Sequence, residues 1–356
     1  MLIEYQIPYI SKIFKQFAEI ECKGKSNLYY LLSHQIAEDD ELLKFCKQCR
    51  ERQPIPNLFL GAVHYLLLKK VDEDLAVHYP SISNKVSKKI PYDLFKKFCL
   101  ENEASIRTIL STRIVQTNAV NRTAYLMPII SSLYSTEDKL TVVDIGASSG
   151  LNLNYDRYQY NYGSDLTFGK GSVMIKSKIL QGELPDFRSI KKASRKIGID
   201  QNTLDLRKSD NSLWLKGLIW PDLRDRFGLI ESAIEEFRLS EEVELMNGNR
   251  ISQFREIINT IPLEESIFIY HTHVLYQFTI EERVRFREML DEIGKNRHLN
   301  YLAVEGGGIF DYSSYPKGQV FMELTKYSEG KKSLNNLGKV DAHGRWIEWN
   351  SIVREM

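Results

Sequence analysis

The residues best suited to chemistry lie in one short segment, residues 141–151, which reads TVVDIGASSGL. An apolar run ends in an acid, a turn of small residues follows, and a helix is then expected to begin. Small residues let the backbone pass close to a ligand. A carboxylate there is badly placed against a pyrophosphate and suits a cationic amine or hydroxyl groups. The segment therefore predicts a ligand-binding turn whose contacts are Asp144, Gly146, Ser148 and Gly150.

Two histidines follow another apolar run, IFIY, as His271 and His273. Imidazole titrates near neutral pH, so either one suits a general base or a group that orients a substrate. A hydrogen-bonded structural pair is an equally good interpretation. If the strand continued, both side chains would share a face, and Glu305 would be the only candidate third ligand for a metal. We predict catalytic roles for the two histidines and no metal.

Helices and strands must hold these residues in place, and the sequence indicates two halves in which the apolar residues have different spacing. Residues 1–135 carry apolar stripes at helical spacing, with Pro54 and Pro56 marking a break before a helix over Asn57–Lys70. Residues 136–356 instead contain short segments rich in Val, Ile, Leu or Tyr, with helical patterns between several of them. The expected strands are Leu140–Ile145, Arg195–Ile199, Val243–Met246, Ser266–Tyr270 and Asn300–Val304.

Short apolar strands alternating with helices are typical of a parallel sheet covered on both faces. Two later segments, Gly318–Tyr327 and Arg345–Trp349, have no obvious helix between them and predict an antiparallel hairpin at one edge. Thr279 and Glu282 form a capping box for a helix that runs to about residue 293. An insertion at about residues 156–195 carries alternating tyrosines and predicts another hairpin.

Composition narrows the class of protein. The chain has 356 residues, 43% of them hydrophobic, and Lys plus Arg (48) nearly balance Asp plus Glu (47) for a net charge of +1. This is ordinary globular composition, and it disfavours nucleic acid as a partner. The longest apolar stretch is too short for a bilayer, and the four cysteines suggest reduced, buried thiols. We expect a cytoplasmic protein without a membrane partner.

The pattern Asp-x-Gly-x-Ser-x-Gly at residues 144–150 resembles the first motif of class I S-adenosylmethionine-dependent methyltransferases. Ser148 stands where that motif usually has glycine, which is tolerable if its φ stays negative. The resemblance implies a doubly wound, mostly parallel, seven-stranded Rossmann-like sheet that binds S-adenosylmethionine. It also implies cofactor roles for Asp200 at the ribose, Asn249 at the adenine and Arg122 at the methionine carboxylate.

A larger set of phrases resembles one bacterial family, known only as domain of unknown function 2332. The phrases are spread over residues 50 to 310 and include PNL, VHYLL, QTN, GLNL, DRY, GID and WL. The family looks like a variant of the methyltransferase fold with a helical N-terminal region. Its substrate is not established, so the resemblance supports the fold and the cofactor class and leaves the reaction open.

The expected function is transfer of a methyl group from S-adenosylmethionine to a small polar molecule. The Asn/Asp-Pro-Pro-Tyr/Phe signature of nucleic-acid aminomethyltransferases is absent after the fourth expected strand, where His271-Thr272-His273 stands. Two alternatives remain open. One is a non-catalytic binding protein of the same fold. The other is a nicotinamide-dependent oxidoreductase, disfavoured by Asp144 and by the lack of Gly-x-Gly-x-x-Gly.

Overall fold

The computed structural model describes residues 6–70, 72–84, 92–116, 118–163, 166–240, 242–248, 250–310, 315–328 and 330–350. The chain forms two compact units, one of residues 1–117 with 207–231 and one of residues 118–206 with 232–356. The boundary expected after residue 135 thus falls after residue 117. The segment 207–231, expected in the second domain, belongs to the helical unit.

The first unit is helical in its described residues, as the apolar spacing predicts. Pro54 precedes the first turn of α4 and Pro56 lies within it, where a missing N–H costs no intrahelical bond. The elements are α1 (Ile7–Gln16), the π-helical η1 (Phe17–Cys22), α2 (Asn27–Ile36), α3 (Asp40–Leu43), η2 (Lys44–Gln48), α4 (Ile55–Lys69), α5 (Glu73–Ala76), α6 (Tyr92–Glu101), α7 (Glu103–Thr112) and α9 (Ser209–Gly217). The next helix, α10 (Arg224–Leu239), has residues in both units.

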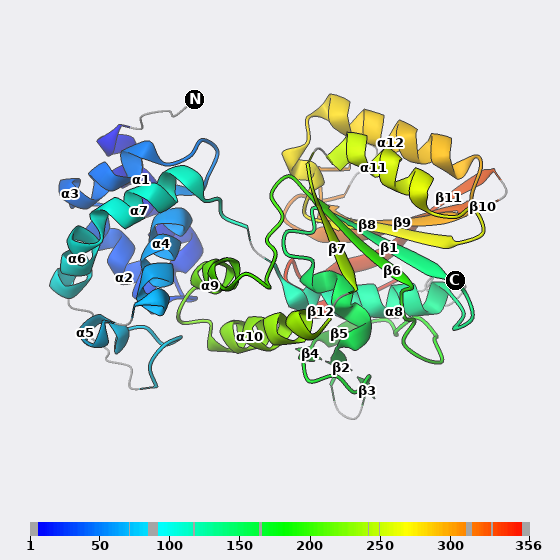
Figure 1. The fold of residues 1–356 in the computed structure, drawn as a ribbon, viewed down its shortest axis with the longest axis horizontal. Helices are drawn as coiled ribbons and strands as arrows, with labels where there is room; N and C mark the ends of the chain where they lie inside the picture. The colour runs from blue at the N-terminus through cyan, green and yellow to red at the C-terminus, as the bar shows by residue number, and fades with distance from the viewer. Residues whose placement is uncertain are drawn as a thin grey trace. The chain divides into compact units, whose positions relative to one another are not determined.

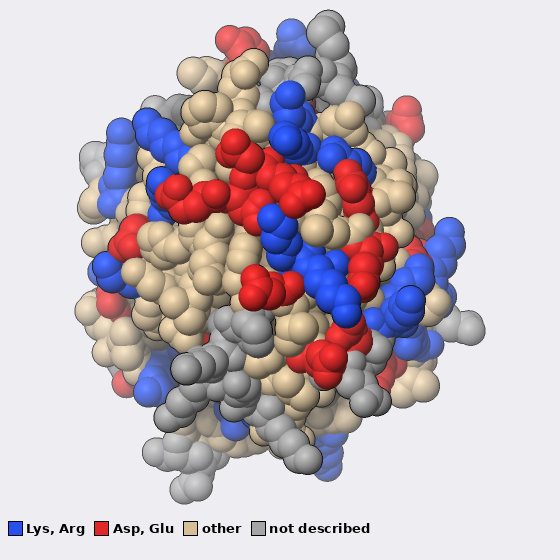
Figure 2. Space-filling view, turned by 90° about the vertical axis from the view of Figure 1, so that its left-hand side faces the viewer, with Lys and Arg blue, Asp and Glu red and all other residues tan. Residues whose placement is uncertain are grey.

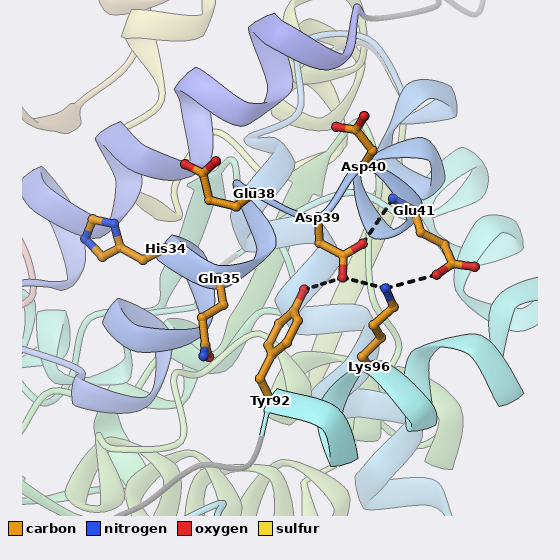
Figure 3. Close-up of a pocket in the computed structure, with 8 residues that line it drawn as sticks. All are labelled: His34, Gln35, Glu38, Asp39, Asp40, Glu41, Tyr92 and Lys96. Carbon is orange, nitrogen blue, oxygen red and sulfur yellow. Dashed lines mark hydrogen bonds and ion pairs between the residues drawn. The ribbon is translucent and has the colours of Figure 1, made fainter.

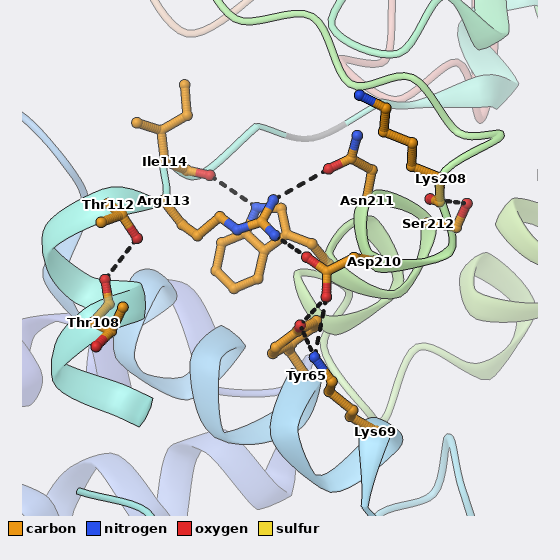
Figure 4. Close-up of polar contacts among 11 residues, drawn as sticks. Tyr65, Lys69, Thr108, Thr112, Arg113, Ile114, Lys208, Asp210, Asn211 and Ser212 are labelled. Atoms are coloured by element: carbon orange, nitrogen blue, oxygen red, sulfur yellow. Dashed lines mark hydrogen bonds and ion pairs between the residues drawn. The ribbon is translucent and has the colours of Figure 1, made fainter. Parts of the chain in front are cut away.

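Polar contacts hold residues 207–231 against the other helices of the first unit (Figure 4). The carboxylate of Asp210 accepts hydrogen bonds from the Tyr65 hydroxyl and from Lys69 Nζ, the latter at 3.2 Å, and forms an ion pair with Arg113. Gly217 lets α9 approach α4 closely, because a Cβ there would lie 2.8 Å from the Cβ of Tyr65. These side chains therefore have a structural task within this unit.

The second unit is built on a nine-stranded sheet rather than the seven strands expected (Figure 1). Its order is β5-β12-β11-β10-β9-β8-β1-β6-β7. The bounds are β1 (Leu140–Ile145), β5 (Lys178–Gln181), β6 (Arg195–Asp200), β7 (Val243–Asn247), β8 (Ser266–Thr272), β9 (Leu299–Gly306), β10 (Val320–Ser328), β11 (Lys331–Val340) and β12 (Trp346–Trp349). The architecture is mixed α/β with a mostly parallel sheet.

The parallel core runs from β7 to β9, and an antiparallel edge begins with β10. The two segments expected to form the edge hairpin are strands β10 and β12, but they do not pair with each other. Strand β11, which was not predicted, lies between them and pairs in antiparallel with both. After β1 the chain continues to β6, which pairs with one edge of β1. The later strand β8 pairs with the other edge of β1. Strand order reverses between β1 and β8, and ligands of open α/β sheets bind beyond the carboxyl ends of the strands at such a point.

Helices cover both faces of this sheet (Figure 1). One face packs on α11 (Arg250–Thr260) and α12 (Ile280–Gly294), whose apolar residues share a core with Val143, Ile269 and Tyr301. The capping box of Thr279 and Glu282 is present at the start of α12, as predicted. The other face carries α8 (Thr123–Leu133), preceded by η3 (Val120–Arg122).

The insertion contains the predicted antiparallel strand pair and two strands beyond it. Strands β2 (Gln159–Asn161), β3 (Thr167–Phe168) and β4 (Met174–Lys176) form a separate small sheet in the order β3-β2-β4. Strand β5 of the same insertion pairs in parallel with β12 and becomes an edge of the main sheet. The three alternating tyrosines, Tyr158, Tyr160 and Tyr162, are buried, as alternation predicts. Pairing with β12 depends on a strand distant in sequence, which local pattern does not indicate.

Figure 2 shows Lys and Arg interspersed with Asp and Glu on one face of the molecule. Within the described residues no helix has the length and apolar character that crossing a bilayer requires.

Candidate functional site

The carboxyl edge of the sheet holds two polar clusters, on opposite faces. Asp144 and Tyr270 are register partners on β1 and β8, and the Tyr270 hydroxyl donates to Asp144 Oδ2 at 2.9 Å. Side chains alternate along a strand, so His271 points to the other face, where it meets Tyr301 and Phe286 of the α12 side. The sheet therefore separates His271 from Asp144.

The turn after β1 uses left-handed backbone at Gly146, Ser148 and Gly150, with φ of +82°, +54° and +75°. Most of its N–H groups already have acceptors within the chain. Those of Gly146 and Ala147 donate to the carbonyl of Ile199 at 2.7 and 3.2 Å, and that of Ser148 donates to Asp200 Oδ2 at 2.9 Å. The turn is thereby fixed against the end of β6, and it leads into η4 (Leu151–Arg157), a 3-10 helix rather than the expected α-helix.

The positive φ of Ser148 corrects the expectation that it stays negative. Left-handed backbone costs a non-glycine residue about 1–2 kcal/mol, and here the bond from Ser148 to Asp200 holds it in place. The substitution Ser148→Gly should raise the free energy of unfolding by about 0.5–1 kcal/mol. The β-branched Ser148→Thr should lower it. Chemical denaturation of both variants measures this, and a destabilised Ser148→Gly protein would contradict it.

Burial dominates the electrostatics of Asp144. Its side chain is 3% exposed, and this desolvation raises the pKa of Asp144 to about 7. The hydrogen bond from Tyr270 and the charge of Arg122 oppose the rise, while the charge of Asp200 adds to it. Asp144 thus changes charge near neutral pH.

The turn is not open to a ligand in this conformation, contrary to the expectation from its small residues. The isopropyl group of Val274 lies against Gly146, and a Cβ on that glycine would overlap Val274 Cγ2. Val274 follows His273, whose φ of +56° is strained for a histidine. A ligand that contacts Gly146 must displace this side chain.

His271 is fully buried, and both of its ring nitrogens have partners. Nδ1 lies 2.8 Å from Glu305 Oε1, and Nε2 lies 2.5 Å from the Tyr301 hydroxyl. Glu305 Oε1 also accepts the N–H groups of Val274 and Leu275 at 2.6 and 2.8 Å. Although burial opposes it, these bonds hold the pKa of Glu305 below its usual value. Together, His271 and Glu305 hold the loop that carries Val274.

His273 does not join His271 in a shared cluster. Its Nε2 is buried without a hydrogen-bond partner among the described residues. Burial, followed by the charge of Arg122, lowers the pKa of His273 to about 4, so the ring is neutral at physiological pH. No three His, Cys, Asp or Glu side chains gather around a possible metal position in the described ranges.

Three other residues were predicted to contact the cofactor: Asp200, Arg122 and Asn249. Asp200 lies at the turn, where its oxygens accept the N–H groups of Ser148 and Asn202. The guanidinium of Arg122 instead donates to the Ala342 carbonyl at 2.9 Å and to Thr272 Oγ1 at 3.0 Å. Its predicted role at a cofactor carboxylate must compete with these bonds. Asn249 lies outside the described residues.

Sequence reasoning missed two groups on the Asp144 face. Tyr270 was interpreted as part of an apolar strand, and the buried hydroxyl of Tyr125 on α8 has no hydrogen-bond partner among the described residues. Their signal is present in retrospect, because a buried tyrosine needs a polar partner for its hydroxyl. Only pairing of β8 with β1 shows that Asp144 is that partner for Tyr270.

A second polar hollow lies in the helical unit and does not share these residues (Figure 3). It is lined by His34, Gln35, Glu38, Asp39, Asp40, Glu41, Tyr92 and Lys96. Lys96 pairs with Asp39 at 2.8 Å and with Glu41 at 3.0 Å, and Asp39 also caps α3. Ion pairing and helix capping explain Asp39 and Glu41, so the candidate site remains at the sheet.

The fold is mixed α/β, with helices on both sheet faces and a left-handed turn at the reversal of strand order. Within that class, the chain belongs to the family DUF2332, described as an uncharacterized protein conserved in bacteria, whose model matches residues 11–349. No protein of curated function matches the sequence.

Proposed function

We propose that this protein is an S-adenosylmethionine-dependent methyltransferase acting on a small polar molecule. The observation that carries the proposal is the convergence of Asp144, Asp200 and a left-handed turn at the point where strand order reverses. Two carboxylates beside a close backbone approach suit a ligand with a positive sulfonium and ribose hydroxyls. The near-neutral surface fits a small acceptor better than a nucleic acid.

Asp144, His273 and His271 have different roles in the proposed reaction. When bound, S-adenosylmethionine supplies a methyl group activated by its sulfonium. Asp144 attracts the cation in its ionised form, and the buried setting strengthens that attraction because water is excluded. His273 is neutral and has an unpartnered Nε2, so it is the candidate for the group that accepts the proton of the acceptor molecule, although its pKa of about 4 makes it a weak base. His271 acts at a distance by holding Glu305 and the Val274 loop.

One observation favours the non-catalytic alternative. Both nitrogens of His271 are occupied, so one of the two predicted catalytic histidines has a structural explanation. A binding protein of the same fold would keep the turn and the carboxylates without needing a base. The nicotinamide alternative is weakened further, because four N–H groups of the turn are bonded within the chain and a pyrophosphate requires such donors.

Calorimetry of the full chain tests the proposal with S-adenosylmethionine, S-adenosylhomocysteine and NADH. Saturable binding of the first two and none of NADH is expected. Binding of NADH alone would overturn the proposal. Methyl transfer to a panel of small amines, carboxylates and hydroxyl compounds then separates a transferase from a binding protein.

The variant Val274→Ala should bind S-adenosylhomocysteine more tightly than the wild type. It removes the methyl groups that lie against Gly146, so less structure has to move when the ligand enters. We expect about tenfold higher affinity, which corresponds to about 1.4 kcal/mol. The lost packing should lower the free energy of unfolding by about 1–3 kcal/mol. Equal or weaker ligand affinity would show that the ligand does not contact Gly146.

A further inference from the structure

The polar groups around the turn are unbalanced, because four of its N–H donors have partners while two nearby acceptor oxygens have none among the described residues. The bonded N–H groups are those of Gly146, Ala147, Ser148 and Gly150. In contrast, the carboxamide oxygens of Asn118 and Asn152 are buried and have no hydrogen-bond partner among the described residues. A buried acceptor without a donor costs about 1–3 kcal/mol. A donor from outside the chain would remove that cost.

The contacts of Asn118 fix which of its atoms is unpaired. Its Nδ2 donates to the Ala147 carbonyl at 3.1 Å and to Ser149 Oγ at 2.9 Å. A carbonyl only accepts, so the nitrogen must face Ala147 and the amide cannot be turned over. Asn118 Oδ1 is therefore an acceptor held rigidly beside the turn. Asn118 and Asn152 are each only 6% exposed, so bulk water does not readily satisfy either oxygen.

The charged side chains near the turn also favour a ligand that donates hydrogen bonds and carries a positive charge. Asp144 and Asp200 interact electrostatically on this face of the sheet, and both offer acceptor oxygens. The nearest cation, Arg122, already donates to Ala342 and Thr272. A carboxylate or phosphate at this place would meet mainly acceptors. A primary ammonium group offers three N–H donors and a positive charge, and it complements the cluster.

We propose that Asn118 and Asn152 determine specificity for a primary ammonium group on the ligand held at the turn. The inference rests on the proposed function, in which this group is the α-ammonium of the methionine part of S-adenosylmethionine. We expect the carboxylate of that part to contribute less, because it would be repelled by the carboxylates of Asp144 and Asp200 on the same face.

Three adenosyl thioethers separate these contributions in calorimetry of the wild-type chain. S-adenosylhomocysteine carries the ammonium and the carboxylate, its decarboxylated aminopropyl analogue carries the ammonium alone, and methylthioadenosine carries neither. We expect the first two to bind within about threefold of each other and methylthioadenosine at least about tenfold more weakly. Equal affinity for all three would overturn the inference and leave the proposed function standing. Binding of none would overturn both.

Variants show whether the two asparagines are responsible. Asn152→Leu and Asn118→Ala should each reduce the preference for the aminopropyl analogue over methylthioadenosine to about threefold or less. Asn121→Ala is the control, because both amide atoms of Asn121 have partners: Nδ2 donates to the carbonyls of Lys176 and Gly344, and Oδ1 accepts from the Lys176 N–H. It should keep the wild-type preference. Retained preference in the first two variants, or its loss in the control as well, would contradict the inference.

Discussion

Replacing Asp144 with asparagine is expected to make the protein more stable at pH 8 and nearly unchanged in stability at pH 4. The folded-state pKa of Asp144 is raised to about 7 by burial, whereas an unfolded chain has the ordinary value near 3.8. A raised pKa means that stability is full below the unfolded pKa and falls as pH rises from there through the folded pKa. The loss amounts to about 2–4 kcal/mol above pH 7, and Asp144→Asn removes it.

The same substitution should weaken ligand binding. An ionised carboxylate that contacts a cation contributes about 1.5–3 kcal/mol, so Asp144→Asn should lower the affinity for S-adenosylmethionine by about tenfold or more. Affinity of the wild type should also rise between pH 6 and 8 as Asp144 ionises, and the variant should lack that rise.

Hydrogen exchange of the β1 amides at both pH values measures local stability, and calorimetry measures affinity. Tyr270→Phe is a useful control, because it removes the hydrogen bond to Asp144 and keeps the carboxylate. A more stable Asp144→Asn protein with unchanged affinity would assign this acid to something other than the ligand.

Replacing Lys196 with methionine is expected to destabilise the protein by about 3–5 kcal/mol. Lys196 Nζ lies 2.6 Å from Asp156 Oδ1, and the two side chains are 1% and 5% exposed. Burial already raises the pKa of Asp156, and Lys196 is the main group that opposes this. Without it, Asp156 is a buried carboxylate whose remaining bond is a backbone N–H from Ala193 at 3.2 Å.

Denaturation in guanidinium measures the loss, which should be larger at pH 8 than at pH 5 because protonation of Asp156 relieves part of it. Adding Asp156→Asn to the Lys196→Met chain should recover about 2 kcal/mol or more, since the amide can still accept from Ala193. If the free energy of unfolding of the single variant fell by less than about 1 kcal/mol, the ion pair would be exposed to water and would contribute little to stability.

Local pattern predicted the parallel strands well. Leu140–Ile145 is β1 to the residue, and the four other expected segments overlap β6, β7, β8 and β9. Four of these five strands end at a polar or glycine residue, and β1 is followed directly by Gly146. The residues of each strand therefore carry the signal that predicts it. The nine-strand count was not predictable in the same way, because β5 becomes a strand of this sheet only by pairing with β12.

In the candidate site, too, local pattern predicts some features, and tertiary contacts determine the others. That Asp144 and Asp200 end neighbouring strands follows from parallel order, and the structure places both at the turn. The positive φ of Ser148 and the position of Val274 depend on tertiary contacts with Asp200 and Glu305, which no local pattern encodes. His271 and His273 look equivalent in sequence. They differ in structure because alternation ends after Thr272, where β8 stops.

The position of bound S-adenosylhomocysteine in a crystal of the full chain tests the central claim most directly. We expect difference density along residues 144–150, an amino group near Asn118, and Val274 moved away from Gly146. Density at another place in the sheet, or an unmoved Val274 with no ligand beside it in crystals soaked well above the affinity found in solution, would contradict it.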